Sequence, residues 1–399
     1  MLFSFTNHTL DTDRRELRRG SGRIPVEPQV FDLLVYLIEN RDRVVTKDDL
    51  IASVWGGRIV SDSTLTSRIN AARKAVGDNG EDQAFIRTVA RKGVRFVGEI
   101  EQASALCSKI LITRHSAPGY LRQEIQFCVA SDGVRIAFAS VGEGPPLVKT
   151  ANWLNHLEYD WQSPIWSHLL RALAAKRHLV RYDQRGNGLS DWDIDDMSFE
   201  AFVRDLECVV NATALDEFPL LGVSAGCAVS IAYATQHPER VSRLVLYGGF
   251  ARGAFRRGSR EQAEQWAALA TLMQHGWGQD NPAFRQIFTS QFIPGGTPEQ
   301  VQWFNDLQRV TTSPENAVRM LRTVGDIDVT GLLAQIRIPT LVLHCRDDAR
   351  VPFEEGRRMA ASIPGARFVA LEGRNHLVLE GEPASGRLLD EIRGFLGPS

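Results

Sequence analysis

The chain has 399 residues, of which 43% are hydrophobic and 24% are charged. This length allows two or three domains of about 150 residues each, and the composition is that of ordinary globular domains, which excludes intrinsic disorder. The net charge of −2 argues by itself against a nucleic-acid partner, because phosphate binding needs a local excess of Lys and Arg. No apolar run is long enough to cross a bilayer and the first residues do not form a signal peptide, so we expect a soluble cytoplasmic protein.

The cysteines give no sign of a metal site. Their positions, 107, 128, 208, 227 and 345, contain no CxxC pair and no spacing suited to zinc. Their odd number favours reduced thiols over a disulfide framework. We therefore expect neither a metal nor another cofactor.

The first quarter of the chain has the pattern of a small α+β domain. Its short strand patterns, separated by Asn, Asp and Gly, predict a small meander over 2–5, 9–11, 16–19 and 23–26. Apolar residues then recur at helical spacing behind Pro28, and a second short helix follows Thr46, a favourable N-cap. A third helix begins at Asp62 or Ser63 and ends at Gly77.

The third predicted helix has one apolar and one polar face. Leu65, Ile69, Ala72 and Val76 share the apolar face. Strand patterns over 85–89 and 94–97 follow and form a hairpin with a basic tip. Between positions 63 and 95, seven basic residues face three acidic ones, so this segment is the candidate phosphate-facing surface.

Strands, three helices and a basic hairpin together make a winged helix-turn-helix. Two stretches, DSTLTSRI at 62–69 and IRTVARKGVRF at 86–96, resemble the OmpR/PhoB-type DNA-binding domain, more closely its CadC-like branch. The resemblance implies that the third helix reads the major groove and that the hairpin is the wing. The DNA-contacting residues that it implies are Thr64, Thr66, Ser67, Arg68, Asn70 and Arg73 on the helix and Arg91 and Lys92 on the wing. For each position alone, a solvated helix face is the open alternative.

The rest of the chain has a different pattern. We place the winged helix at 1–100, a linker at 101–123 and a second domain at 124–399, in which strands alternate with helices. The strand patterns lie at 125–130, 135–141, 147–150, 178–182, 219–222, 243–247, 339–344 and 367–370. Such alternation predicts an α/β fold, with a mostly parallel sheet and helices on both faces. A mainly helical insertion occupies about 251–336.

A nucleophile motif lies between a strand and a helix of this second domain. In Gly222-Val223-Ser224-Ala225-Gly226, the two glycines allow a tight turn that holds the serine in a strained, exposed position. Asp348 and His376 follow, each just past a strand pattern, in the chain order that a hydrolase triad of this fold needs. The region therefore resembles the α/β-hydrolase superfamily. Asp347 is the alternative acid, but Asp348 matches the D-x-x-V-P pattern of that superfamily.

The resemblance implies acyl-transfer chemistry. Ser224 would be the nucleophile, His376 the general base and Asp348 the group that orients the imidazole. Backbone N–H groups of Ala225 and Trp153 would form the oxyanion hole, and the helical insertion would be a cap that sets substrate choice. A nearby run of aromatic residues is favoured as core or cap packing, with a pocket wall as the alternative: Trp153, His156, Tyr159, Trp161 and Trp166.

Two functions fit this domain combination. The first is a one-component transcriptional regulator that binds double-stranded DNA and senses, with or without hydrolysis, a small organic ligand. The second is a serine hydrolase or esterase in which the winged helix is accessory. Neither function involves a membrane. Related winged helices commonly bind DNA repeats as dimers, so a homodimer stays open, as do the ligand, the operator and the sign of regulation.

Overall fold

The chain divides into two compact units, Met1–Ser116 and Ala117–Ser399. The structure is a computed structural model. It describes residues 2–6, 8–12, 16–19, 22–24, 26–41, 43–54, 62–78, 82–89, 92–98, 121–258, 260–277, 279 and 283–397. Arg91 and most of the predicted linker lie outside these residues, so the boundaries 1–100, 101–123 and 124–399 stay predictions.

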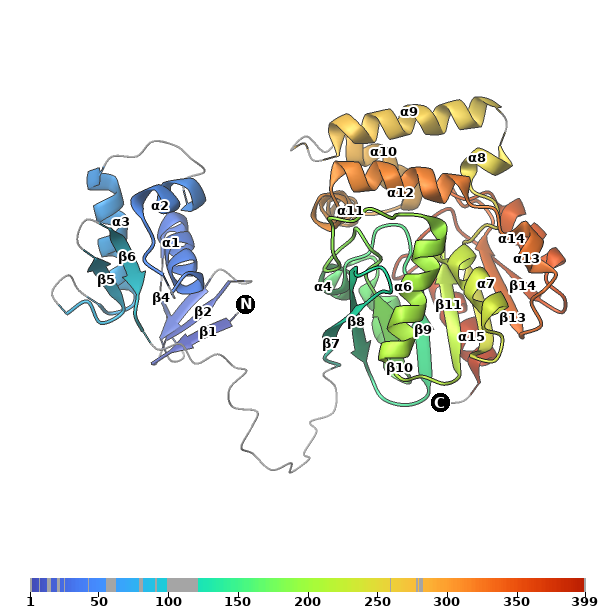
Figure 1. The fold of residues 1–399 in the computed structure, drawn as a ribbon, viewed down its shortest axis with the longest axis horizontal. Coiled ribbons are helices and arrows are strands. Elements are labelled where there is room, and N and C mark those ends of the chain that lie inside the picture. The colour runs from blue at the N-terminus through green and yellow to red at the C-terminus, as the bar shows by residue number, and fades with distance from the viewer. Residues whose placement is uncertain are drawn as a thin grey trace. The chain divides into compact units, whose positions relative to one another are not determined.

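The N-terminal unit opens with the predicted meander. Four antiparallel strands pair in chain order. They are β1 (Leu2–Phe5), β2 (His8–Asp11), β3 (Glu16–Arg19) and β4 (Gly22–Ile24). Three helices and a two-stranded hairpin follow: α1 (Pro28–Glu39), α2 (Lys47–Val54), α3 (Asp62–Ala75), β5 (Ile86–Val89) and β6 (Gly93–Phe96). This is the strand and helix order of a winged helix-turn-helix (Figure 1).

Local chemistry explains where these elements begin and end. Thr46 and Asp49 cap α2 reciprocally: the Asp49 N–H donates to Thr46 Oγ1 at 3.1 Å, and the Thr46 N–H donates to Asp49 Oδ2 at 2.9 Å. Gly77, with a φ of +73°, follows the end of α3. The wing strand β6 is tied to the helices because the backbones of Val94 and Val45 exchange two hydrogen bonds, of 2.8 and 2.9 Å.

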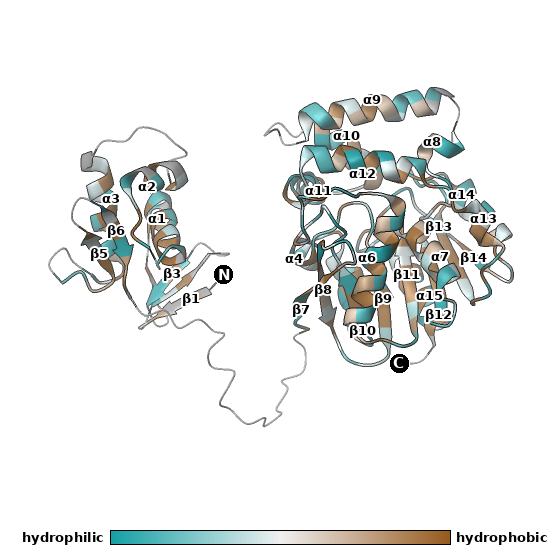
Figure 2. Ribbon diagram, in the orientation of Figure 1, coloured by the Kyte–Doolittle hydropathy of each residue, from teal (hydrophilic) through white to brown (hydrophobic). Residues whose placement is uncertain are grey.

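The C-terminal unit is built on an eight-stranded sheet with the order β14-β13-β12-β11-β9-β10-β8-β7. The strands are β7 (Glu124–Val129), β8 (Arg135–Val141), β9 (Pro146–Lys149), β10 (His178–Tyr182), β11 (Phe218–Val223), β12 (Val241–Tyr247), β13 (Thr340–Cys345) and β14 (Arg367–Leu371). All pairs are parallel except those that β8 makes with β7 and β10. The predicted mostly parallel sheet is therefore confirmed. Its central strands are strongly hydrophobic, as expected of a sheet covered on both sides (Figure 2).

Helices cover both faces of this sheet, and α6 packs on α7 while α5 packs on α15 (Figure 1). These helices are α4 (Leu157–Gln162), α5 (Ser167–Ala174), α6 (Phe199–Ala212), α7 (Gly226–Gln236), α13 (Thr330–Leu333), α14 (Phe353–Ser362) and α15 (Pro383–Leu396). Within the described part of the chain, no helix combines the length and the apolar character that crossing a membrane requires.

The predicted helical insertion forms a cap above one end of the sheet (Figure 1). It consists of α8 (Ala254–Arg257), α9 (Arg260–Gly276), α10 (Ala283–Phe292), α11 (Pro298–Thr311) and α12 (Pro314–Asp326). The cap is attached firmly at its base. Thr312 Oγ1 donates to the carbonyl oxygen of Gly186 at 2.5 Å, and Thr323 Oγ1 donates to that of Met197 at 2.8 Å.

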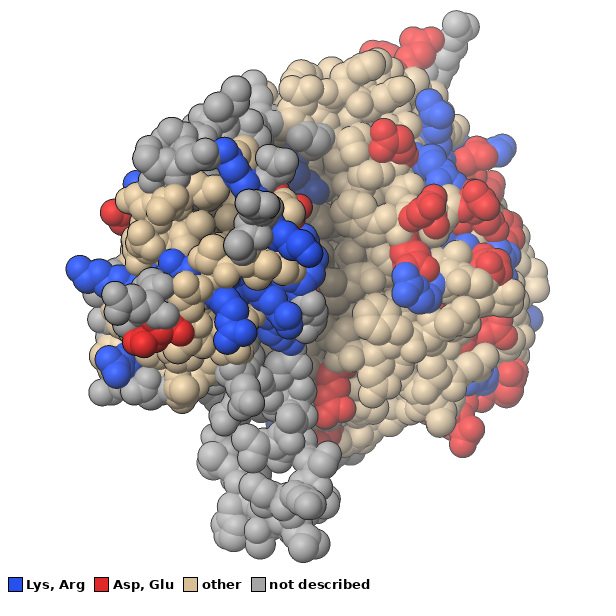
Figure 3. Space-filling view, turned by 60° about the vertical axis from the view of Figure 1, so that its left-hand side comes forward, with Lys and Arg blue, Asp and Glu red and all other residues tan. Residues whose placement is uncertain are grey.

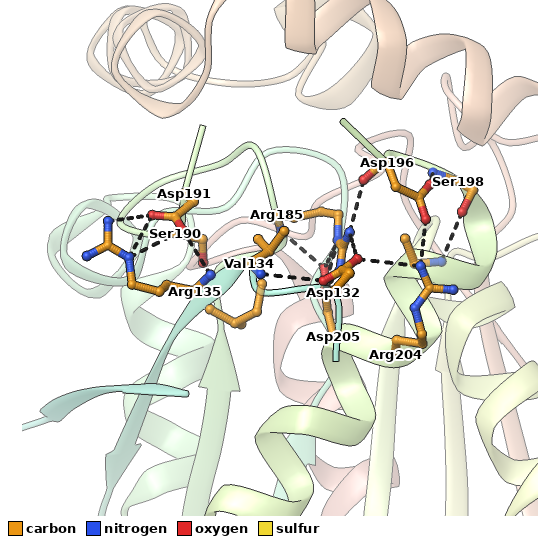
Figure 4. Close-up of polar contacts among 12 residues, drawn as sticks. Asp132, Val134, Arg135, Arg185, Ser190, Asp191, Asp196, Ser198, Arg204 and Asp205 are labelled. Atoms are coloured by element: carbon orange, nitrogen blue, oxygen red, sulfur yellow. Dashed lines mark hydrogen bonds and ion pairs between the residues drawn. The ribbon is translucent and has the colours of Figure 1, made fainter. Parts of the chain in front are cut away.

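A buried arginine joins the loops beneath the cap (Figure 4). Arg185 lies 2.7 Å from a carboxylate oxygen of Asp205 on α6 and 2.7 Å from one of Asp132 in the β7–β8 turn. The side chains of Arg185 and Asp205 are both fully buried. Burial raises the pKa of Asp205 to about 6, although the Arg185 guanidinium opposes this rise. Arg185 therefore joins three chain segments: the β7–β8 turn, the loop after β10 and α6.

We predict that Arg185→Met destabilises the hydrolase unit by about 3–5 kcal/mol, because it leaves the Asp205 carboxyl buried without its partner. The matched control is Arg135→Met, whose partner is Asp191 and whose side chain is 69% exposed. That variant should lose less than about 1 kcal/mol. Urea unfolding of the full chain, followed by tryptophan fluorescence, measures both. Equal unfolding midpoints for the two variants would show that the buried pair contributes nothing.

Candidate active site and nucleic-acid interface

Ser224 occupies a strained turn between β11 and α7. Its φ of +53° lies in the left-handed region, which non-glycine residues seldom adopt. Both flanking glycines are required by space. A Cβ on Gly222 would lie 2.7 Å from Ser230 Oγ, and one on Gly226 would lie 2.5 Å from the carbonyl oxygen of Ala151. The turn therefore holds Ser224 close to the loop that follows β9.

Asp348 and His376 meet at the ends of β13 and β14. The Oδ2 atom of Asp348 lies 2.8 Å from Nδ1 of His376, and both side chains are fully buried. The other carboxylate oxygen, Oδ1, accepts backbone N–H groups from Arg350 at 2.8 Å and Val351 at 2.9 Å. Burial acts to raise the pKa of Asp348, but the neighbouring His376 and these backbone donors outweigh it, so the pKa is lowered. The carboxylate is thus held ionised beside the imidazole.

The backbone around His376 is also fixed. The hydroxyl of Tyr247 donates to the carbonyl oxygen of His376 at 2.7 Å, and the His376 N–H donates to that of Phe292 at 2.9 Å. The Ser224 N–H in turn donates to the Tyr247 carbonyl oxygen at 2.9 Å, so one residue contacts both segments. Nε2 of His376 is enclosed and has no hydrogen-bond partner among the described residues. It is the nitrogen that would face a nucleophile, and such contacts are often long before substrate binds.

The choice between the two adjacent acids is clear from their positions. Asp348 reaches the imidazole, whereas Asp347 is exposed at the surface. Gly248, with a φ of +60°, lies against the pair: a Cβ there would come within 3.2 Å of the His376 ring. The structure therefore brings together the acid and the base that the sequence singled out.

A narrow cavity lies above Ser224. It leaves about 10 Å³ of room, close to what one water molecule needs. Its walls come from the sheet and the cap: Trp153, Ser224, Ala225, Phe250, Ala254, Arg257, Trp266, Phe292, Val324, Arg350 and Val351. A wider outer pocket of about 520 Å³ shares four of these residues, Ala254, Arg257, Trp266 and Arg350. These four residues therefore border both spaces.

The two expected oxyanion residues, Trp153 and Ala225, both line the inner cavity. No hydrogen bond from either backbone N–H is present among the described residues. The loop that carries Trp153 is held from below, because Lys149 Nζ donates to Asn152 Oδ1 at 2.6 Å and Asn152 Nδ2 donates to the Trp153 carbonyl oxygen at 3.0 Å. Burial lowers the pKa of Lys149 to about 8. Because the Ala225 and Trp153 N–H groups donate no hydrogen bond within the described part of the protein, both can donate to a ligand oxygen.

The aromatic run behaves mostly as core, the interpretation favoured from the sequence. Trp161 and Trp166 are buried, and Tyr159 packs on Trp303 of the cap with ring centres 4.3 Å apart. Among the five residues of this aromatic run, Trp153 is the one that lines the inner cavity.

Sequence reasoning missed most of the cavity wall. Arg350 lies inside the D-x-x-V-P stretch, two residues after Asp348, and this spacing was an available signal. Arg257 and Trp266 lie in the cap, where nothing in the sequence indicated which helix face points at Ser224. Phe250 lies three residues after the end of β12, so the order of the strands brings it to the site.

The polar face of α3 is largely accessible. Thr66, Ser67 and Asn70 are exposed, while Thr64 and Arg68 are half-buried. Arg68 is ion-paired with Glu27. On the hairpin, Lys92 is exposed, and among the described residues of α3 and the hairpin the exposed basic side chains are Lys74, Arg87, Lys92 and Arg95. Figure 3 shows Lys and Arg side chains gathered on the N-terminal unit. Local positive charge therefore exists despite the negative net charge of the chain.

Arg73 departs from the expectation that it contacts DNA. It is only 6% exposed, and its guanidinium donates to the Ile86 carbonyl oxygen at 3.0 Å and to Thr88 Oγ1 at 2.8 Å. A third bond, of 3.3 Å, goes to Asn70 Oδ1. Arg73 therefore joins α3 to the wing strand β5. The helical pattern placed it on the polar face, but it did not show that the hairpin folds back against that part of the helix.

We predict that Arg73→Met loosens the wing, at a cost of about 1–3 kcal/mol, because the Ile86 carbonyl loses a charged donor. Hydrogen exchange of the backbone amides in 86–96 of the full chain measures this opening. Lys74→Met is the matched control, since Lys74 is exposed on the same helix. Exchange rates that rise equally in both variants would contradict the assigned role of Arg73.

Each of the two units matches a different family of known proteins. Residues 156–383 match the family described as alpha/beta hydrolase fold, and residues 21–96 match the family described as transcriptional regulatory protein, C terminal. The chain therefore belongs to the alpha/beta hydrolase fold family. It also carries an OmpR/PhoB-type winged-helix regulator domain ahead of that fold, and both resemblances inferred from the sequence are confirmed.

Individual relatives cover one unit each. A pyrrolizixenacetamide deacetylase from Xenorhabdus hominickii is 27% identical over 267 residues, which are 66% of this chain and 94% of that protein. The transcriptional activator CadC of Escherichia coli (strain K12) is 32% identical over 83 residues, 21% of this chain and 16% of CadC. A hydrolase structure from Pseudomonas aeruginosa PA01 is 24% identical, with a TM-score of 0.58, and covers 69% of this chain and 98% of its own. At this sequence identity, the similarity to the Pseudomonas aeruginosa structure shows the fold alone.

Proposed function

We propose that this protein is a one-component transcriptional regulator that binds double-stranded DNA through its winged helix and binds a small organic ligand in its hydrolase domain. The observation that carries the proposal is the buried Asp348–His376 pair beside the Ser224 turn, in a chain that also has a winged-helix regulator domain. Such an arrangement suits a ligand pocket that is able to turn its ligand over.

The chemistry proposed for the pocket is ester hydrolysis. Ser224 Oγ bonds to the acyl carbon while its proton passes to Nε2 of His376, and the N–H groups of Ala225 and Trp153 bind the oxyanion. When the intermediate collapses, the bond to the leaving alkoxide breaks and that oxygen takes the proton from His376. Water then attacks the acyl-Ser224 ester with the same nitrogen as base, which releases the acid. Asp348 keeps the imidazole in the required tautomer throughout.

The proposed DNA contacts come from α3 and the wing. Thr64, Thr66, Ser67, Arg68 and Asn70 would face the major groove, and Arg91 and Lys92 the backbone. Exposure of Asn70 and Lys92 supports this assignment. Arg73 is left out because its donors are used inside the domain.

Regulation also requires that the ligand distinguish two forms of the protein. A ligand shifts an equilibrium only through different affinities for its states. The cap is the part of the hydrolase unit suited to this, since it covers Ser224 with side chains that a ligand must displace.

A second candidate function is that of a serine esterase in which the winged helix is accessory. It is favoured by the similarity to a deacetylase over 94% of that protein's length. The two functions share the pocket chemistry and differ in whether DNA binding responds to the ligand.

We predict that Ser224→Ala and Asp348→Asn each lower kcat/KM for 4-nitrophenyl acetate by at least about 10³-fold, because one removes the nucleophile and the other the correct imidazole tautomer. Asp347→Asn is the matched control, since Asp347 is the exposed neighbouring acid, and it should retain activity. Release of 4-nitrophenolate by the full chain measures all three. Undiminished hydrolysis by Ser224→Ala would eliminate the proposed mechanism.

We predict that the full chain binds DNA from its own upstream region with an affinity that falls steeply as salt rises. Lys92→Ala should reduce the slope of log K against log salt by about 1, through loss of one phosphate contact. Asn70→Ala should weaken specific binding by about 5- to 150-fold, if it pairs with a base edge. Lys176→Ala, on an exposed site of the hydrolase unit, is the control. Absence of binding at every salt concentration would leave the esterase as the better candidate.

A further inference from the structure

Two arginines face the space above Ser224 without an acidic partner. Arg257 ends the cap helix α8, and Arg350 lies in the loop after β13. Both line the inner cavity, and both also line the outer pocket. Within the described part of the chain, neither guanidinium has a carboxylate oxygen within 4.0 Å. Both side chains are half-buried at the border of the two spaces, and charged groups with reduced access to water are normally paired.

The contacts of Arg350 are aromatic and neutral. Its guanidinium lies 4.3 Å from the ring centre of Trp266 and 5.1 Å from that of Phe292. Its one side-chain hydrogen bond among the described residues goes to the amide oxygen of Gln291, at 2.5 Å. A guanidinium has five N–H donors, so most of its bonding capacity is unused. Burial lowers the pKa of Arg350 to about 9, and the charge of Arg257 acts in the same direction. Arg350 is still cationic at neutral pH.

Arg257 has a similar environment. Its guanidinium lies 5.0 Å from the ring centre of Phe250, and it donates one long bond, of 3.4 Å, to the carbonyl oxygen of Arg252. Burial lowers its pKa, and the fields of Glu355 and Asp348 oppose this from beyond ion-pair distance. Two cations therefore border one small cavity, and the charge of Arg257 lowers the pKa of Arg350.

The nearby carboxylates are already engaged. Asp348 is held by His376 and by two backbone N–H groups. In the outer pocket, Glu354 and Glu355 both pair with Arg358, at 3.6 and 3.3 Å. Within the described part of the protein, the guanidinium groups of Arg257 and Arg350 thus have no carboxylate in direct contact, and a bound anion would supply one.

We infer that the hydrolase domain takes an organic acid as ligand, one whose carboxylate binds Arg350 and Arg257 while an ester carbonyl further along the same molecule lies at Ser224. The inference rests on the proposed function only in assigning the ester to Ser224; the carboxylate site stands on the arginines alone. Planar, bidentate recognition of a carboxylate is the interaction for which guanidinium is best suited.

The ligand must also displace side chains, because the inner cavity has room for about one water. The outer pocket, at about 520 Å³, is in the size range of small-molecule sites. Arg350 and Trp266 border both spaces and pack on each other, so an anion bound at Arg350 lies close to Trp266. The fluorescence of Trp266 should therefore respond to binding.

The test uses the full chain carrying Ser224→Ala, so that binding is measured without turnover. The probes are the monomethyl esters of succinate, glutarate and adipate, each against its uncharged dimethyl ester, with tryptophan fluorescence as the readout. We expect at least one monoanion to bind about 30-fold or more tightly than its neutral partner, as for a buried charge pair. If no monoanion is preferred, the inference is wrong.

Variants then test whether Arg350 and Arg257 cause the preference for the monoanion. Arg350→Gln and Arg257→Gln, each in the Ser224→Ala background, should reduce it to within about threefold, through loss of one charged partner. Arg357→Gln is the matched control, because Arg357 is exposed on α14 and does not line the inner cavity, although its partner Glu354 lines the outer pocket. Arg350→Lys, which keeps the charge, should retain part of the preference and guards against misfolding of the glutamine variant. A preference that survives both glutamine substitutions would overturn the assigned site.

Hydrolysis distinguishes this inference from the proposed function. With Ser224 present, kcat/KM for 4-nitrophenyl hemiglutarate should exceed that for 4-nitrophenyl pentanoate, which has the same five-carbon acyl chain without the charge. Arg350→Gln should lower that ratio, and Arg357→Gln should not. Equal hydrolysis of both esters would overturn the carboxylate site and leave the hydrolase proposal intact. Selective binding of a monoanion without Ser224-dependent hydrolysis would support the carboxylate site and overturn the proposed ester hydrolysis.

Discussion

The close approach of the Ser224 turn to the loop after β9 is the constraint on which the active-site region depends. Gly226 has no room for a side chain beside the Ala151 carbonyl, and Gly222 has none beside Ser230. Ser224 consequently takes a left-handed conformation that costs free energy of order 1–3 kcal/mol. The surrounding sheet holds this conformation. Because the turn and the loop lie this close together, Ser224, Ala225 and Trp153 border the same small cavity.

Much of the fold was predictable from the sequence because its patterns are local. The period of the strands, the helix caps and the glycine turns predicted the strands, the three helices of the first domain and the helical insertion, but not the individual helices that cover the large sheet. Strand ends predicted Ser224, Asp348 and His376 at one edge of that sheet. Asp348 was preferred over Asp347 because its distance from Pro352 matches the D-x-x-V-P pattern of the superfamily that the sequence resembles. These features depend on residues close in the chain or on the parallel order of the strands.

The features that were not predictable depend on how distant faces meet. Arg73 has the spacing of an exposed residue on α3, yet its guanidinium is used by β5, thirteen or more residues further along the chain. Arg257 and Trp266 lie on cap helices whose orientation over Ser224 is set by packing between elements far apart in sequence. Helical periodicity shows which residues share a face, but it does not show what that face contacts. The position of Arg257 and Arg350 at the same cavity depends on packing of this kind.

The tightness of the cavity above Ser224 has a thermodynamic consequence for any receptor built on this domain. With room for about one water, the inner cavity cannot take a ligand at Ser224 while its lining side chains stay in place. The occupied and empty proteins must therefore differ structurally, which is the condition for occupancy to be communicated elsewhere. Part of each ligand's interaction energy is used to open the site, so its apparent affinity is reduced in proportion to how rarely the open form is populated. In such a receptor, molecules too small to compensate for that opening would be rejected, so a response would need a minimum of contact with the cap.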